Sequence, residues 1–193
     1  MMLRKMFYLL TAVSLLAFAT GCEKDADEKA VEDPGVTVRT DATLGAAGNA
    51  NASAYDLEGN TGISIDGPSA EKQAAADLVF LNDDAAQSTI YAPSAVPSGS
   101  VAAWGTKNQT TFIALTSFTK AQFDALTTAQ KVQDAYTGAT ATKVSLTSAP
   151  KFYAIKTVTG RYAVLYVKTF TAGVNGSIVC DFVIQKDAAA EVK

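Results

Sequence analysis

The sequence predicts a mainly β fold: an antiparallel β-sandwich-like domain with a C-terminal three-stranded meander and one short or interrupted helical insertion. Strand-forming residues cluster late in the chain, and two turn dipeptides, Thr159-Gly160 and Asn175-Gly176, interrupt them. Gly160 ends a link of hairpin length and supplies the positive φ that such turns demand. A separate segment carries several helix-start signals. The strands predicted for the meander are residues 151–158, 161–169 and 177–185.

The chain divides by composition into four parts. Residues 1–21 have the features of a signal peptide, and residues 22–53 form an acidic, Gly/Ala-rich segment with few large apolar side chains. Such a segment cannot offset the entropy cost of ordering, so a flexible tether is predicted there. Residues 54–187 form the predicted β domain, and residues 188–193 a polar tail.

The N-terminal segment is read as a lipoprotein signal peptide. Arg4 and Lys5 precede an apolar run of about 14 residues, and small residues lead to Gly21-Cys22. A permanent transmembrane anchor is the alternative, but the run is shorter than the roughly 20 residues that span a bilayer. Gly21-Cys22 resembles the bacterial lipobox, which implies a palmitate-type lipid on Cys22 and attachment of the chain to a membrane.

An acidic tract follows the cysteine directly. It contains Glu23, Lys24, Asp25, Asp27 and Glu28, and it resembles the surface-export signal of Bacteroidota lipoproteins. The alternative is a solvated charge run without a signal. The resemblance implies an outer-membrane lipoprotein at the cell surface, with the periplasmic face as the other open location.

The first half of the predicted domain contains three strand candidates. Residues 62–66 alternate apolar and polar side chains and stop at Gly67-Pro68, as a half-buried strand does. Residues 77–81 form a continuous apolar run typical of a central strand. Residues 87–91 are a further candidate.

The predicted helical insertion covers about residues 119–137. Thr119 and Gln122 have capping-box spacing, and Phe118 and Phe123 occupy the positions of a hydrophobic staple. The pattern weakens in the middle and stops at Gly138. One interrupted helix or two short ones, covering part of a sheet, are therefore expected.

Cys180 is the second of two cysteines. If Cys22 is lipidated, Cys180 has no partner within the chain, so packing must hold the domain together. At strand spacing Cys180 shares a face with Ile178, Phe182 and Ile184. A buried structural thiol is predicted.

Charge is distributed unevenly along the chain. Residues 23–84 contain 14 acidic and 4 basic residues, whereas residues 85–186 contain 3 acidic and 9 basic ones. One interpretation is a basic face suited to an anionic glycan, and the other is scattered, solvent-facing lysines. Diffuse basic residues in an exported chain argue against nucleic acid. The basic face would comprise Lys143, Lys151, Lys156, Arg161, Lys168 and Lys186.

Four residues are the candidates for ligand binding: Trp104, Lys156, Arg161 and Lys168. Trp104 lies in a polar, loop-like stretch, where it could stack on a sugar or fold back to anchor its loop.

The available side chains restrict catalysis. The chain has no histidine, and its three methionines all belong to the signal peptide, so the common general base, the histidine-activated nucleophiles and most zinc sites are excluded. Ser69 and Lys72 match the S-x-x-K pattern of serine β-lactamases and penicillin-binding proteins. The S-D-N and K-T-G motifs that accompany this pattern in those enzymes are missing from the sequence. No catalytic residue, metal or cofactor is predicted. A hydrolase without histidine, using Ser69, Lys72 or Asp83, is an alternative.

Residues 151–168 resemble the C-terminal strand pair of the Bacteroidota HmuY-like lipoproteins, and residues 76–80 are weakly similar to another strand of that family. The resemblance implies an all-β cell-surface lipoprotein, and haem or porphyrin carriage as an alternative function. That family holds haem through His or Met side chains, which the mature chain lacks. The leading prediction is a non-catalytic, lipid-anchored binding or interaction module at the outer membrane, for an anionic glycan or a partner protein.

Overall fold

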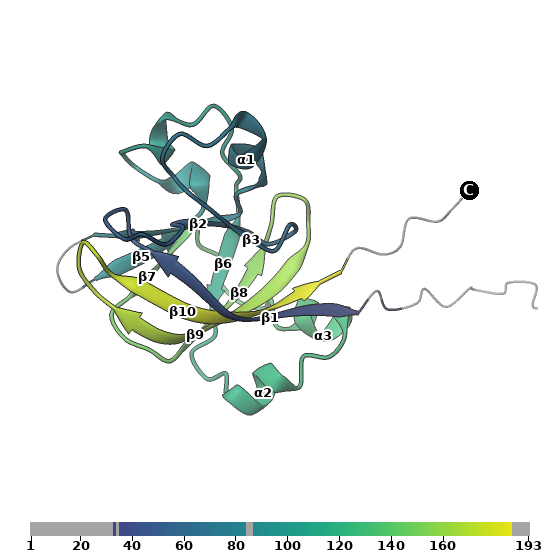
Figure 1. Cartoon of the computed structure of the whole chain (residues 1–193). Coiled ribbons are helices and arrows are strands. Elements are labelled where there is room, and N and C mark those ends of the chain that lie inside the picture. The colour runs from purple at the N-terminus through teal and green to yellow at the C-terminus, as the bar shows by residue number, and fades with distance from the viewer. Residues whose placement is uncertain (1–32, 34, 84–86, 187–193) are drawn as a thin grey trace, which may run out of the picture. The chain divides into compact units, whose positions relative to one another are not determined.

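A computed structural model describes residue 33 and residues 35–83 and 87–186 (Figure 1). The chain separates into two compact units, residues 1–31 and 32–193, and every described residue belongs to the second. Cys22 and the acidic tract from Glu23 to Glu28 lie outside the described residues, as does the predicted tail 188–193.

Two five-stranded antiparallel sheets form the domain, which confirms the mainly β, sandwich-like fold. In the first sheet the strand order is β1 (Val36–Gly45), β10 (Ser177–Gln185), β9 (Tyr162–Thr171), β8 (Lys151–Lys156) and β6 (Thr111–Ala114). In the second the order is β3 (Thr61–Ile63), β2 (Ala54–Asp56), β4 (Leu78–Asn82), β5 (Ser88–Tyr91) and β7 (Lys143–Leu146). Strands β8, β9 and β10 are neighbours in chain order, so the predicted meander is present.

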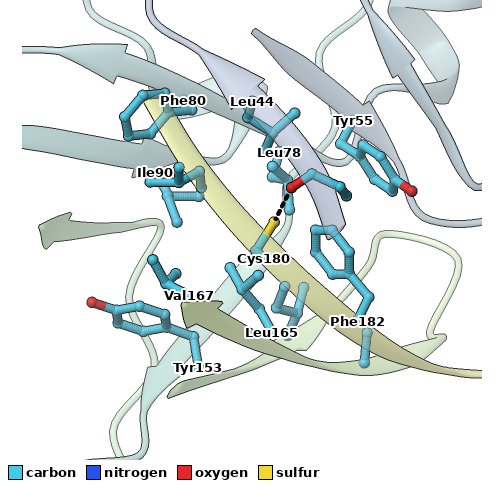
Figure 2. Close-up of a cluster of buried hydrophobic side chains, with 14 of the residues drawn as sticks. Leu44, Tyr55, Leu78, Phe80, Ile90, Tyr153, Leu165, Val167, Cys180 and Phe182 are labelled. Atoms are coloured by element: carbon cyan, nitrogen blue, oxygen red, sulfur yellow. Dashed lines mark hydrogen bonds between the residues drawn. The ribbon is translucent and has the colours of Figure 1, made fainter. Parts of the chain in front are cut away.

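The main core lies between the two sheets. Phe80 and Ile90 enter it from the second sheet, and Leu165 and Phe182 from the first (Figure 2). Cys180 is fully buried there, and its thiol donates a hydrogen bond to the carbonyl oxygen of Ala42 at 3.4 Å. Burial raises the pKa of Cys180 to about 12. The prediction of a buried structural thiol is confirmed.

The tether prediction is wrong from residue 36 onward, because Val36–Gly45 is strand β1. This strand pairs with β10 from Val36 opposite Gln185 to Gly45 opposite Ser177. Ala42 and Leu44 are buried in the main core. The segment has few large apolar side chains, but β10 supplies backbone partners along its whole length, which composition alone does not reveal.

The predicted helical insertion consists of two short helices, α2 (Lys120–Asp124) and α3 (Ala129–Asp134). Thr119 and Gln122 form the expected capping box. Phe123 and Val132 pack on the outer face of the first sheet, against Val164 and other apolar side chains of β8–β10. The helical pattern ends at Asp134 rather than at Gly138.

The outer face of the second sheet is covered by α1 (Ala70–Ala75) and by residues 93–104, which include the 3-10 turns Pro93–Ala95 and Val101–Ala103. Val96, Val101 and Trp104 pack there against Val79 and Tyr91. Apolar side chains therefore cover the outer faces of both sheets, and the openings of the domain lie at its edges and loops.

The turn between β8 and β9 is longer than predicted. The amide of Thr157 donates to the carbonyl of Arg161 at 2.9 Å, which closes a three-residue loop, 158–160, instead of a two-residue link. Gly160 has φ +88°, the left-handed residue that follows a type I turn in such loops.

Candidate functional site

Two of the surface clefts on the described part of the chain, of about 410 and 430 Å³, differ in position and charge. The first, the seam cleft, has a volume of about 430 Å³ and lies where β6 and β7, an edge strand of each sheet, meet. Its walls include Thr116, Phe118, Ser145, Lys151, Phe152 and Tyr153. Pockets of about 300–1,000 Å³ are typical of small-molecule sites.

In the part of the chain that the structure describes, Lys151 is the only basic residue that lines the seam cleft. It is exposed at the start of β8, and no other described residue forms a hydrogen bond or ion pair with its ammonium group. The hydroxyl groups of Thr116 and Ser145 and the backbone of both strands provide further polar groups. The cleft therefore combines one free positive charge with hydroxyl and aromatic surfaces.

Aromatic packing fixes the wall of the seam cleft. The Phe152 ring stacks on Tyr166 with centroids 4.6 Å apart and meets Phe118 edge-on at 5.6 Å. The Tyr153 hydroxyl donates to the carbonyl of Ser145 at 3.4 Å, joining the two sheets. Burial raises the pKa of Tyr153 to about 12, so the phenol keeps its proton at neutral pH. The wall is thus formed in advance of any ligand.

The second opening, the loop-end cleft, has a volume of about 410 Å³ and lies among loops at one end of the sandwich. Ile65, Leu81 and Val101 form its apolar floor, and among the described residues Asp66 is the only charged one that lines it. Ala47 and Gly48 of its lining belong to the loop after β1, and Val174 belongs to the loop before β10. Figure 1 shows these two strand ends next to each other.

Trp104 is not available for stacking on a sugar. Its side chain is 6% exposed and packs with Val101 in the cluster outside the second sheet. Of the two interpretations, the loop anchor is confirmed and the exposed ligand-binding role is wrong. The sequence could not decide between them, because the polar residues around Trp104 do not show which side of the loop faces the sheet.

Lys156 and Arg161 lie at the hairpin between β8 and β9, and both contact other side chains of the domain. The Lys156 ammonium is 5.2 Å from the centroid of the Tyr162 ring. Arg161 is largely buried, with its Nε 3.8 Å from the Glu58 carboxylate. At this hairpin, Glu58 from the acidic first half of the chain thus partly neutralises Arg161 from the basic second half.

Lys168 occupies a bulge of β9 and is held by two carboxylates. Val179 pairs with Thr169 and Cys180 with Val167, which leaves Lys168 without a partner in the ladder. Its ammonium lies 2.7 Å from the Asp181 carboxylate and also contacts Asp41. The hydrogen bonds that the Lys168 ammonium donates to Asp181 and, second, to Asp41 raise the pKa of Lys168. Lys156, Arg161 and Lys168 therefore do not form one free basic face.

Asp77 is the most perturbed carboxyl group near these residues. It is 3% exposed, and its Oδ2 accepts a hydrogen bond from the Leu57 amide at 2.9 Å. Burial raises the pKa of Asp77 to about 7, with smaller contributions from Asp56 and Glu58. It does not line either cleft. No local pattern in the sequence indicates the raised pKa of Asp77, because its burial depends on the pairing of β2 with β4.

The candidate residues of a histidine-free hydrolase have structural partners. The Ser69 hydroxyl caps α1 by accepting from the Lys72 amide at 3.4 Å. Asp83 accepts hydrogen bonds from the hydroxyls of Thr89 and Tyr91. Within residues 35–83 and 87–186, no group of three or more acidic or cysteine side chains is arranged to hold a metal ion. No helix among the described residues is long and apolar enough to cross a membrane.

The structure defines a two-sheet antiparallel β-sandwich domain on which the seam cleft and the loop-end cleft carry opposite charge. Neither a protein-family model nor a curated protein matches the sequence. Among solved structures, the domain is similar to a crystal structure of a DUF4466 family protein from Parabacteroides merdae, with 12% sequence identity and a TM-score of 0.48. The match covers 78% of this chain and 54% of that one, so the chain spans about half the length of that protein.

Lys151 and Asp66 line the two clefts but were not among the predicted ligand-binding residues. Lys151 was placed only in the general basic face, and Asp66 was placed at the end of a strand without a role. The sequence signal for Lys151 is its position directly before Phe152 and Tyr153 at a strand start. No local signal identifies Asp66, because residues far apart in the chain build its cleft.

Proposed function

We propose that this chain is a non-catalytic, lipid-anchored lipoprotein of the outer membrane, displayed at the cell surface, whose β-sandwich binds an anionic glycan in the seam cleft. The free ammonium group of Lys151, beside the partly exposed Phe118 ring and the exposed side chains of Thr116 and Ser145, carries the proposal. Sugars present hydroxyl groups and apolar ring faces together, and a carboxylate on the sugar would pair with Lys151.

The lipid anchor rests on Gly21-Cys22 and the apolar run before them. Replacing Cys22 with Ala removes the only thiol available for lipid attachment at that site. Cells expressing the Cys22→Ala chain should retain the uncleaved signal peptide and show no label from radioactive palmitate. A labelled, shortened chain in that variant would contradict the proposed anchor.

Glycan binding is tested with digalacturonic acid and its dimethyl ester, in which both carboxylates are replaced by neutral methyl esters on the same sugar rings. Calorimetric titration should show binding of the acid and binding at least about tenfold weaker for the ester, as expected for a charge-assisted hydrogen bond. Equal affinity for both ligands, or none for either, would contradict the proposal for an acidic sugar.

Lys151→Gln supplies the residue-level test. It should weaken binding of the acid about tenfold or more and leave the weak binding of the ester unchanged. Lys186→Gln is the matched control, because Lys186 is also exposed but lies at the end of β10 and does not line the cleft. If both variants weaken binding equally, general charge rather than the seam cleft is responsible.

A further inference from the structure

The loop-end cleft has an apolar floor that belongs to a packed cluster. Ile65 and Val101 line the cleft and are buried in the cluster that also contains Trp104. Leu81 and Val174 add further apolar surface, and Val174 is 70% exposed. The apolar surface of Leu81 and Val174, above the buried side chains of Ile65 and Val101, loses contact with water when an apolar ligand group enters the cleft.

The rim of the loop-end cleft is held in place by contacts between two loops. The Asn49 side-chain amide donates to the carbonyl of Asn175 at 2.8 Å. Gly48 approaches so closely that a Cβ atom there would lie 2.7 Å from the carbonyl oxygen of Val174. These contacts join the loop after β1 to the loop before β10, so the cleft is formed without a ligand.

The charge in the loop-end cleft is negative and unpaired. Asp66 is exposed, and its carboxylate makes no hydrogen bond or ion pair with any other described residue. Within residues 35–83 and 87–186, no Lys or Arg lines this cleft, and the remaining polar side chains there are those of Asn82, Ser98 and Ser100. An anionic ligand would meet a like charge here, whereas a cation would meet a counter-charge above an apolar surface.

We propose that the loop-end cleft is a second binding site that takes a small organic monocation, in which an ammonium group is joined to an apolar body. The apolar body lies against Leu81 and Val174, and the ammonium pairs with the Asp66 carboxylate at the rim. Asn82 and the two serines accept the remaining hydrogen bonds of the ammonium. This site depends neither on the lipid anchor nor on glycan binding in the seam cleft.

Cyclohexylmethylamine is a suitable probe, and cyclohexylmethanol is its neutral counterpart of nearly the same shape. The chain contains a single tryptophan, Trp104, which packs in the cluster under the cleft floor, so its fluorescence reports local binding. Titration at pH 7 should show a saturable change with the amine and an affinity at least about fivefold lower for the alcohol. Affinity for the amine should fall with rising salt.

Asp66→Asn should reduce affinity for the amine to that for the alcohol, and Asp66→Lys should abolish binding of the amine. Glu71→Gln is the matched control, because it removes one exposed carboxylate on α1 that does not line the cleft. Equal affinity for amine and alcohol, an unchanged affinity in Asp66→Asn, or no saturable binding of the amine would each overturn the proposal. An unchanged thermal melt of each variant shows that lost binding does not reflect unfolding.

Discussion

Asp77 shows how a single side chain couples stability to pH in this domain. It is buried next to β2, and burial raises its pKa from 3.8 to about 7. The folded state therefore favours the neutral acid more than the unfolded state does. Its stabilising contribution is fully present below about pH 4 and is lost as pH rises toward 7.

Asp77→Asn should remove this dependence, because the amide keeps an oxygen that can accept from the Leu57 amide and carries no charge. Compared with the parent chain, the variant should be more stable at pH 8, by an amount on the order of 3 kcal/mol, and nearly equal at pH 4. Urea unfolding at both pH values measures the difference. A constant difference between the two chains across this range would contradict the assigned pKa of Asp77.

Local spacing in the sequence predicts the environment of some residues but not of others. Cys180 lies on the inward face with Ile178 and Phe182, as the period of two predicts. Spacing does not predict the burial of Trp104 or Asp77, because the residues that surround them come from distant segments of the chain.

At the scale of the element, two neighbouring bulges place Lys168 between Asp41 and Asp181. Arg39 pairs with Phe182 and Ala42 with Cys180, so Thr40 and Asp41 lie opposite Asp181 alone. Asp41 has φ +57°, and its amide donates to the Asp181 carboxylate at 2.8 Å. The β1 bulge lies opposite Asp181 and the β9 bulge lies between the pairs of Val179 and Cys180. The Lys168 ammonium joins the two bulges through its contacts with Asp41 and Asp181.

Lys168→Met should lower the free energy of unfolding by about 1–2 kcal/mol, because the largely buried carboxylate of Asp181 loses its counter-charge. Asp41→Asn should cost less than about 1 kcal/mol. Asp41 is exposed, and asparagine tolerates the left-handed backbone found there. Denaturant melts at low salt measure both. A larger loss in Asp41→Asn than in Lys168→Met would contradict the central role of the Lys168–Asp181 pair.

The helical insertion shows how far local signals reach. Thr119, Gln122, Phe118 and Phe123 predict the start of α2, and the capping box is present. The break between α2 and α3 was also expected from the weak middle of the segment. The residues against which α2 and α3 pack could not be predicted, since they lie on three strands of the first sheet.

For the whole molecule, β1 decides whether the region before residue 54 is only a flexible tether or also part of the folded domain. If residues 22–53 were only a tether, their removal would leave the domain folded. In the structure, β1 pairs along β10 and buries Ala42 and Leu44 in the main core. Its removal would expose the edge of β10 and a cavity between the sheets.

Two truncations test this difference. A chain lacking residues 1–32 should unfold cooperatively with a melting temperature close to that of the intact domain. A chain lacking residues 1–45 should show no cooperative transition, because the lost ladder and core contacts exceed the roughly 5–15 kcal/mol by which domains of this kind are stable. Circular dichroism melts measure both transitions. A folded domain in the chain that lacks residues 1–45 would support the tether interpretation.

The sequence by itself determined the mainly β class, the meander of β8, β9 and β10, the position and start of the helical insertion, and the burial of Cys180. Each follows from local periodicity or from turn and cap residues close together in the chain. Only the tertiary structure showed that Val36–Gly45 is a strand, that Trp104 is buried, and that carboxylates hold Lys168. It also built the two clefts around Lys151 and Asp66. These features depend on which distant strands and loops meet, and local patterns do not encode that choice.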